Sequence, residues 1–166
     1  MSVRIFISLG SNIEPERYIK AALSELSYHF SNLLCSSVFE SESVGFDGSN
    51  FLNMVVAADT DLSIPEVIAV FKKIEQAHGR IPGAKKFSAR SLDLDLLLYD
   101  ELVTQDPIEL PRAEILTNAF VLWPLAEIAP ELLHPVAAQS YQSLWDDYDK
   151  SQQKLWTIPF TCPQMA

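Results

Sequence analysis

Two aspartates, Asp93 and Asp95, alternate with leucines in a single apolar run. On a β-strand, alternate side chains point to the same face, so both carboxylates are predicted to share one face. Their Cβ atoms would lie roughly 6.5–7 Å apart. Such a pair can bracket two hard cations about 3.5–4 Å apart, but the alternation also fits two solvated acidic side chains on an open sheet face. The opposite, buried face is predicted to carry Leu92, Leu94, Leu96 and Leu98.

Half of the twelve basic residues precede these aspartates in one segment. In a protein of formal net charge −10, this concentration favours a small polyanion as ligand and disfavours nucleic acid. A metal-bound triphosphate fits, because magnesium can bridge carboxylates and phosphates while arginines bind phosphate oxygens. Phosphoryl-type transfer needs mainly such positioning and charge neutralisation. The basic residues are Lys72, Lys73, Arg80, Lys85, Lys86 and Arg90.

Phe51 and Asn53 share one face of another predicted strand. The ring of Phe51 can stack on a flat heterocycle, and the Asn53 amide can read its edge with one donor and one acceptor. A core phenylalanine and a strand-end asparagine are the alternative interpretation. The histidines, which have no metal or catalytic spacing, are interpreted as structural or surface residues: His29, His78 and His134.

The elements that position these residues are predicted in the order β-α-β-β-α-β. Pro15 begins the first helix, and Ser63 with Glu66 forms a capping box for the second. The order predicts an α+β fold, a ferredoxin-like sandwich with an antiparallel sheet and helices on one face. A C-terminal extension would add short strands, a helix over 120–128 and an aromatic tail that packs back. The predicted strands are residues 3–9, 33–39, 51–58 and 91–99, and the predicted helices are 15–30 and 63–78.

Length and composition favour one cytoplasmic domain. The 166 residues, 48% of them hydrophobic, suffice for one domain with a core, and we expect it to span 1–166. No apolar stretch approaches the roughly 20 residues of a membrane span, and the N-terminal run is not that of a signal peptide. Cys35 and Cys162 are too few for a disulfide framework, so a reducing compartment is expected.

Several motifs together resemble the hydroxymethyldihydropterin pyrophosphokinase family of folate biosynthesis. The resemblance covers most of the chain, from Val3 to Pro130. It implies a monomeric ferredoxin-like enzyme that transfers the β,γ-pyrophosphoryl group of ATP to the hydroxymethyl oxygen of 6-hydroxymethyl-7,8-dihydropterin and releases AMP. Its motifs are Ser8-Leu9-Gly10-Ser11-Asn12, Phe51-Leu52-Asn53, Gly79-Arg80, Arg90-Ser91-Leu92-Asp93-Leu94-Asp95, Phe120-Val121-Leu122-Trp123-Pro124-Leu125 and Glu127-Ile128-Ala129-Pro130.

The resemblance also implies roles for individual residues. Asp93 and Asp95 would hold two magnesium ions, with ATP as co-substrate. Phe51 and Phe120 would sandwich the pterin and Asn53 would hydrogen-bond its ring, while Ser41 and Val44 would line the pterin pocket.

The nucleotide side is implied in the same way. Arg80 and Arg90 would be the catalytic residues that clamp the phosphates, with help from Lys86. Phe87 stands where many relatives have a tryptophan that packs over the site, and Arg112 joins the ATP-binding set.

The sequence departs from the family pattern before the third helix. Arg112 stands at the family's histidine and Asn118 at its arginine, which predicts slower transfer. The residues Ser41–Gly45 replace a stretch that is proline-rich in relatives. The main alternative is therefore a paralogue that binds pteridine or nucleotide with little or no transfer. A two-carboxylate hydrolase is disfavoured. That chemistry needs one carboxyl group with a raised pKa, whereas basic neighbours favour the ionised form of both aspartates.

Overall fold

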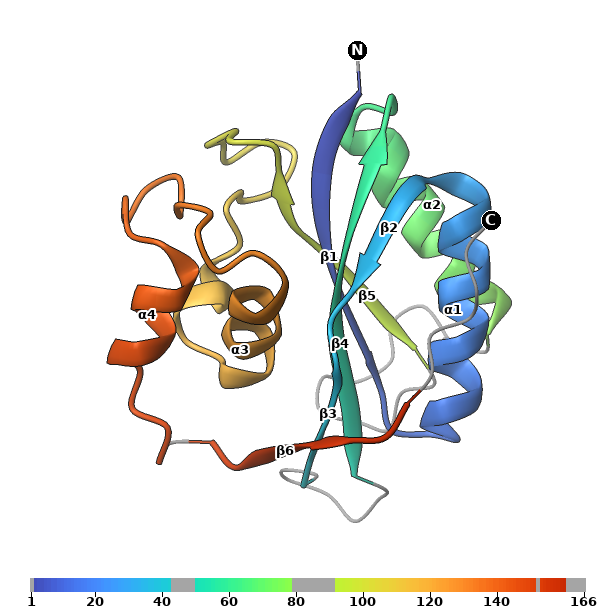
Figure 1. The fold of residues 1–166 in the computed structure, drawn as a ribbon. Coiled ribbons are helices and arrows are strands. Elements are labelled where there is room, and N and C mark those ends of the chain that lie inside the picture. The colour runs from blue at the N-terminus through green and yellow to red at the C-terminus, as the bar shows by residue number, and fades with distance from the viewer. Residues whose placement is uncertain (1, 43–49, 79–91, 152, 161–166) are drawn as a thin grey trace.

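A six-stranded antiparallel sheet separates two helical layers in the computed structural model, which describes residues 2–42, 50–78, 92–151 and 153–160 (Figure 1). The strand order is β5-β1-β4-β3-β6, and β2 also pairs with β4. The strands are β1 (Val3–Ser11), β2 (Ser31–Cys35), β3 (Val38–Ser41), β4 (Phe51–Thr60), β5 (Asp93–Tyr99) and β6 (Leu155–Ile158). The helices are α1 (Pro15–His29), α2 (Ile64–Ala77), α3 (Ala119–Ile128), α4 (Tyr141–Asp147) and the 3-10 helix η1 (Ala113–Leu116).

The predicted order of elements is confirmed, but the prediction of one continuous strand over 33–39 is wrong. The structure has β2 and β3 there, separated at Ser36. The Ser36 hydroxyl accepts a hydrogen bond from the Val55 N–H at 2.9 Å and donates one to the Ser37 carbonyl at 2.7 Å. A serine side chain thus replaces a backbone acceptor in the ladder, and this replacement divides the strand.

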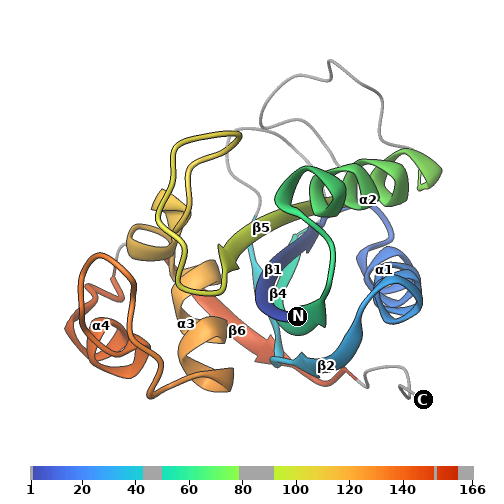
Figure 2. The same ribbon diagram turned by 90° about the horizontal axis from the view of Figure 1, so that it is seen from above.

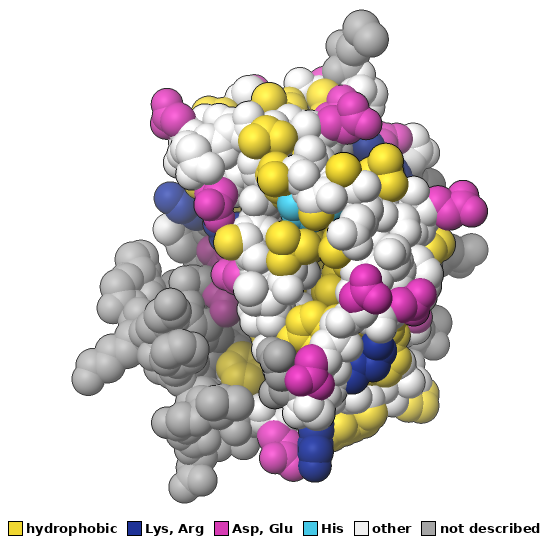
Figure 3. Space-filling model, turned by 90° about the vertical axis from the view of Figure 1, so that its left-hand side faces the viewer, with side chains coloured by type: hydrophobic (Ala, Val, Ile, Leu, Met, Phe, Trp, Pro, Cys, Tyr) yellow, Lys and Arg dark blue, Asp and Glu magenta, His cyan; other side chains and the backbone are white. Residues whose placement is uncertain are grey.

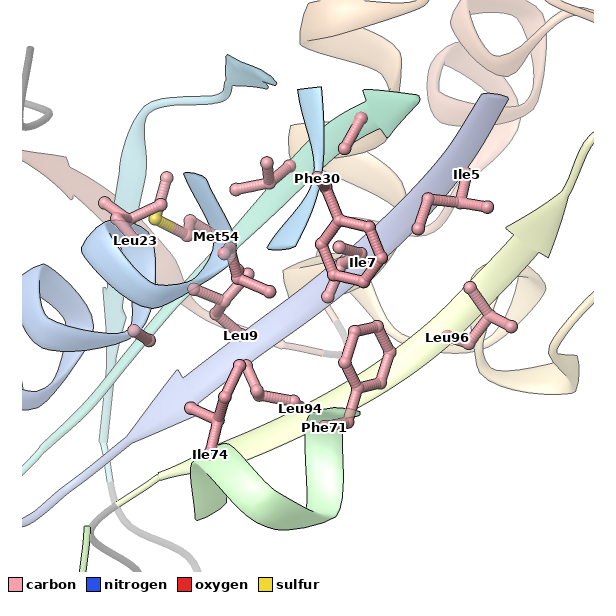
Figure 4. Close-up of a cluster of buried hydrophobic side chains, with 14 of the residues drawn as sticks. Ile5, Ile7, Leu9, Leu23, Phe30, Met54, Phe71, Ile74, Leu94 and Leu96 are labelled. Atoms are coloured by element: carbon pink, nitrogen blue, oxygen red, sulfur yellow. The ribbon is translucent and has the colours of Figure 1, made fainter. Parts of the chain in front are cut away.

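The first core lies between the sheet and the helices α1 and α2 (Figure 4). Leu94 and Leu96 of β5 point toward α2, and the rings of Phe30 and Phe71 meet at 6.2 Å. The predicted capping box holds the start of α2, with reciprocal hydrogen bonds between Ser63 and Glu66. The leucine face of β5 therefore packs against α2.

The second core lies on the other face, which α3 and α4 cover (Figure 2). The C-terminal extension therefore encloses a face for which no helical cover was predicted, while α1 and α2 do share one face as expected. The expectation that Leu98 lies on the same face as Leu96 is wrong. A register shift between Phe6 and Ile7 places Leu97 and Leu98 both in the second core, because a bulge breaks strict alternation.

The aromatic tail packs back on the domain, as predicted. Trp145 of α4 stacks on Trp123 of α3 at 5.1 Å, and Tyr148 stacks on Trp145 at 5.6 Å. Beyond them β6 pairs with β3, so the tail completes the sheet. Ring stacking thus holds the tail to α3, and backbone hydrogen bonds hold it to the sheet.

The outer surface beside α4 mixes apolar and acidic side chains, with few basic ones (Figure 3). Leu133 and Val136 are 56% and 64% exposed there. No helix in the described part of the chain is long and apolar enough to cross a membrane.

His134 is buried beneath this surface and is structural, as its lack of partner spacing indicated. Its side chain is 3% exposed, and Nδ1 accepts hydrogen bonds from the N–H groups of Val136 and Ala137 at 3.1 and 3.0 Å. An accepting Nδ1 requires the neutral ring. Burial lowers the pKa of His134 below its ordinary value.

This burial predicts a loss of stability in weak acid. Below about pH 6.5 the unfolded chain binds a proton that the folded ring excludes, so the free energy of unfolding falls with pH, by at most about 1.4 kcal/mol per pH unit for this group. Urea unfolding of the protein and of His134→Asn between pH 5 and 8 tests this. The asparagine keeps an acceptor without titrating, so its profile should be flatter; identical slopes would contradict the assignment.

Candidate active site

Three strands bring three of the predicted site residues, Asp93, Asp95 and Asn53, onto one sheet face. Gly10 of β1 pairs with Asp93 on β5 and with Asn53 on β4, and Ser8 pairs with Asp95 on β5. Residues in direct cross-strand register point to the same face. The leucines that alternate with the aspartates, Leu92, Leu94 and Leu96, pack in the first core, so both aspartates and Asn53 lie on the face of α3. The prediction that the aspartates share a face apart from the leucines is confirmed.

Gly10 allows Asn53 to lie close over the central strand. A Cβ atom on Gly10 would sit 2.9 Å from Asn53 Oδ1, closer than such atoms approach. Asn53 is only 7% exposed, and no hydrogen bond among the described residues uses its carboxamide. Buried amides are ordinarily paired, so this one has a donor and an acceptor to offer a ligand.

The two aromatic candidates lie on β4 and α3. Phe51 lies on β4 two residues before Asn53 and pairs with Ser41 of β3. Phe120 lies in the first turn of α3 and packs against the second core. Both rings are half-buried, and no ring contact joins them in the described part of the chain.

Asp95 is engaged by Arg112. The guanidinium Nη2 donates to Asp95 Oδ1 at 2.6 Å, with 27% of the arginine and 40% of the aspartate side chain exposed. The Arg112 N–H donates to the Leu97 carbonyl at 3.0 Å, which ties the arginine backbone to β5. The residue at the family's histidine position therefore reaches the aspartate pair.

Glu75 of α2 is a positioning residue that the sequence analysis missed. It is 8% exposed, and its Oε2 accepts a hydrogen bond from the N–H of Leu94 at 2.8 Å. Leu94 stands between the two aspartates, so Glu75 holds the backbone that carries them. The available signal was its spacing, four residues after Phe71 on the apolar side of α2.

Asn118 lies at the start of α3, and no contact among the described residues joins it to the aspartates. It is the N-cap residue of α3, and its Oδ1 accepts from Gln153 Nε2 at 3.2 Å. Gln153 Oε1 in turn accepts from the Ala119 N–H at 2.8 Å. The asparagine thus links the start of α3 to the C-terminal tail.

Several predicted site residues lie outside the described part of the chain. They are Val44, Arg80, Lys86, Phe87 and Arg90. Lys72 and Lys73, the described members of the basic segment, are exposed on α2.

The donor set fits an ion that arrives with phosphates. No group of three or more His, Cys, Asp or Glu side chains able to hold a metal occurs among the described residues. Magnesium, however, commonly takes one or two carboxylates and completes its shell with water and substrate phosphates. Asp93 and Asp95, both half-buried on one face, meet that requirement.

Comparison with known proteins agrees with this geometry. A sequence model described as 7,8-dihydro-6-hydroxymethylpterin-pyrophosphokinase matches residues 6–130. The 2-amino-4-hydroxy-6-hydroxymethyldihydropteridine pyrophosphokinase of Aquifex aeolicus is 34% identical over 80% of this chain and 84% of its own length. The protein of the same name from Pseudomonas aeruginosa is 35% identical over 81% and 86%.

Solved structures support the fold. Wild-type HPPK-DHPS of Plasmodium falciparum, crystallised with pteroate, matches 89% of this chain with a TM-score of 0.73 at 13% identity. This chain spans only 42% of that longer protein. This likeness confirms the ferredoxin-like fold. The sequence matches show that the chain belongs to the 7,8-dihydro-6-hydroxymethylpterin-pyrophosphokinase family.

Proposed function

We propose that this protein transfers the pyrophosphoryl group of ATP to 6-hydroxymethyl-7,8-dihydropterin. The hydroxymethyl oxygen bonds to the β-phosphorus, the bond from that phosphorus to the α,β-bridging oxygen breaks, AMP leaves, and the hydroxyl proton is released. The observation that carries the proposal is the row Asp93–Gly10–Asn53 across three strands. It sets carboxylates beside a buried amide that has hydrogen-bonding capacity to spare.

The pterin is assigned to the Asn53 end of this row. The Asn53 carboxamide pairs with the edge of the heterocycle, and Phe51 and Phe120 stack on its two faces. Ser41, opposite Phe51 in register, lines the same pocket. The family resemblance assigns Val44 to the pterin as well. Burial of Asn53 excludes water from these hydrogen bonds, which strengthens them.

The triphosphate is assigned to the Asp93 and Asp95 end. These carboxylates would hold two magnesium ions, whose charge would neutralise the phosphates and the charge that develops during transfer. Arg80 and Arg90 act as the catalytic cations on the phosphate oxygens, and Lys86, Phe87 and Arg112 bind the nucleotide.

The remaining assignments follow from charge and composition. We propose that the protein is a monomer in the cytoplasm, a compartment that supplies both ATP and a reducing environment. The net charge of −10 disfavours nucleic acid as a partner.

The reaction is tested by combining the protein with ATP, magnesium and the hydroxymethyldihydropterin and measuring AMP. Release of AMP that depends on the pterin supports pyrophosphoryl transfer. Binding of both substrates by calorimetry without any AMP would instead indicate a protein that only binds them.

Loss of either aspartate should stop transfer while the fold is kept. Asp93→Asn and Asp95→Asn each remove an anionic oxygen ligand with little change in side-chain shape, so AMP release should fall at least about a hundredfold while the far-UV circular dichroism stays that of the folded parent. Asp100→Asn, at the exposed turn after β5, is the matched control and should keep full turnover. Unchanged turnover in either site variant would refute the metal role.

Gly10→Ala should weaken pterin binding through Asn53. The new Cβ displaces Asn53 Oδ1, so we expect roughly tenfold weaker pterin affinity in calorimetry with a non-hydrolysable ATP analogue, with nucleotide affinity unchanged. A double-mutant cycle provides the control: Gly10→Ala/Asn53→Ala should bind pterin no worse than Asn53→Ala alone. Fully additive losses would show that Gly10 acts by another route.

Asn118 predicts a slow transferase. The family's arginine supplies a charge-assisted hydrogen bond of roughly 1.5–3 kcal/mol, so Asn118→Arg should raise the rate of AMP release by about ten- to a hundredfold. Asn118→Ala is the control, since it also loses the Gln153 hydrogen bond but adds no cation. No gain in Asn118→Arg, with parent turnover already about 1 per second or faster, would show that the position tolerates either residue.

A further inference from the structure

Arg112 is held where it neutralises one of the paired aspartates. Its backbone N–H is bonded to Leu97, and the two residues before it, Leu110 and Pro111, are buried. The backbone of Arg112 is therefore fixed, and its side chain extends from there to hydrogen-bond Asp95. A 2.6 Å contact between ionised groups is a short, charge-assisted hydrogen bond.

This cation engages a carboxylate oxygen that the proposed metal ion would also use. Two carboxylates on one strand face repel each other unless a positive charge lies beside them. Arg112 supplies that charge from within the chain, through Asp95 Oδ1. In the described part of the chain no hydrogen bond reaches Oδ2, so the carboxylate is only partly engaged.

We infer that Arg112 competes with free divalent cations for Asp95, so that the metal enters the site together with the nucleotide. This inference rests on the proposed function of the aspartates. A free cation must approach a guanidinium that already neutralises its ligand, and like charges at this separation repel. A cation carried by ATP brings phosphate oxygens, to which the guanidinium can transfer in bidentate geometry.

The opposite role makes the opposite prediction. A side chain that hydrogen-bonds a ligating carboxylate can orient it for the metal and raise metal affinity. Under that role, removing Arg112 would weaken cation binding. Under competition, removing it would strengthen binding of the free cation.

The test is titration with Mn²⁺ alone, followed through the electron paramagnetic resonance signal of the unbound ion. Arg112→Gln should bind Mn²⁺ roughly two- to fivefold more tightly than the parent, the range expected when one partly exposed charge is removed. Arg112→Lys keeps the charge and should stay close to the parent. Thermal unfolding with added Mg²⁺ gives a second readout, because ligand binding raises the melting temperature with affinity.

Arg4→Gln is the matched control. Arg4 pairs with Asp59 at 3.0 Å with similar exposure, on the same sheet but away from the site. Its removal changes net charge equally and should leave Mn²⁺ affinity unchanged. If Arg4→Gln gained as much Mn²⁺ affinity as Arg112→Gln, the effect would be one of net charge and the inference would be overturned. It would also be overturned if Arg112→Gln bound Mn²⁺ as tightly as the parent, more weakly, or not detectably.

Failure of the proposed function has a different outcome. If the parent takes up no Mn²⁺ even with a non-hydrolysable ATP analogue, or if Asp95→Asn takes up as much, the aspartates do not hold the metal. If uptake with the analogue is normal and depends on Asp95 while Arg112→Gln gives no gain, only the competition is wrong.

Discussion

The register of β1 against its two neighbours is the constraint on which the site depends. One pairing sets Asn53 beside Gly10 and the other sets Asp93 beside the same glycine. Because alternate side chains change face, a slip of one residue in either pairing would send the aspartates or the amide into the leucine core. Core residues on both strands oppose that slip, since they must remain in the first core: Leu94 and Leu96 on β5, and Leu52 and Met54 on β4. Hydrophobic packing on one face thus positions polar chemistry on the other.

Local patterns predicted the elements well where a single principle governs them. The alternation in β5 placed Asp93 and Asp95 correctly, and the Ser63 capping box marked the start of α2. Prediction failed where side chains or packing at a distance intervene. A serine hydroxyl divides β2 from β3, and a bulge against β1 turns Leu98 to the other core. Neither event leaves a pattern in the residues nearby.

The candidate site was predictable in its residue types more than in its contacts. Motifs indicated Asn53 and the aspartates, but the close approach of Asn53 to Gly10 depends on register across strands. Arg112 and Asn118 stood out only as departures from a family pattern. The structure gives them different partners, Asp95 for one and the tail residue Gln153 for the other. A departure from a family pattern therefore identifies a position without identifying what the new residue contacts.

The short terminal strand β6 also protects the sheet from self-association. Without it β3 would present an open row of backbone donors and acceptors, a template on which other chains can add. The new outermost strand is itself a poor template, because it has four residues and lies between Lys154 and Pro159. At the opposite margin, Glu75 and the Arg112 backbone occupy donor and acceptor groups of β5. The residues that order the site thus also help to keep the protein from aggregating.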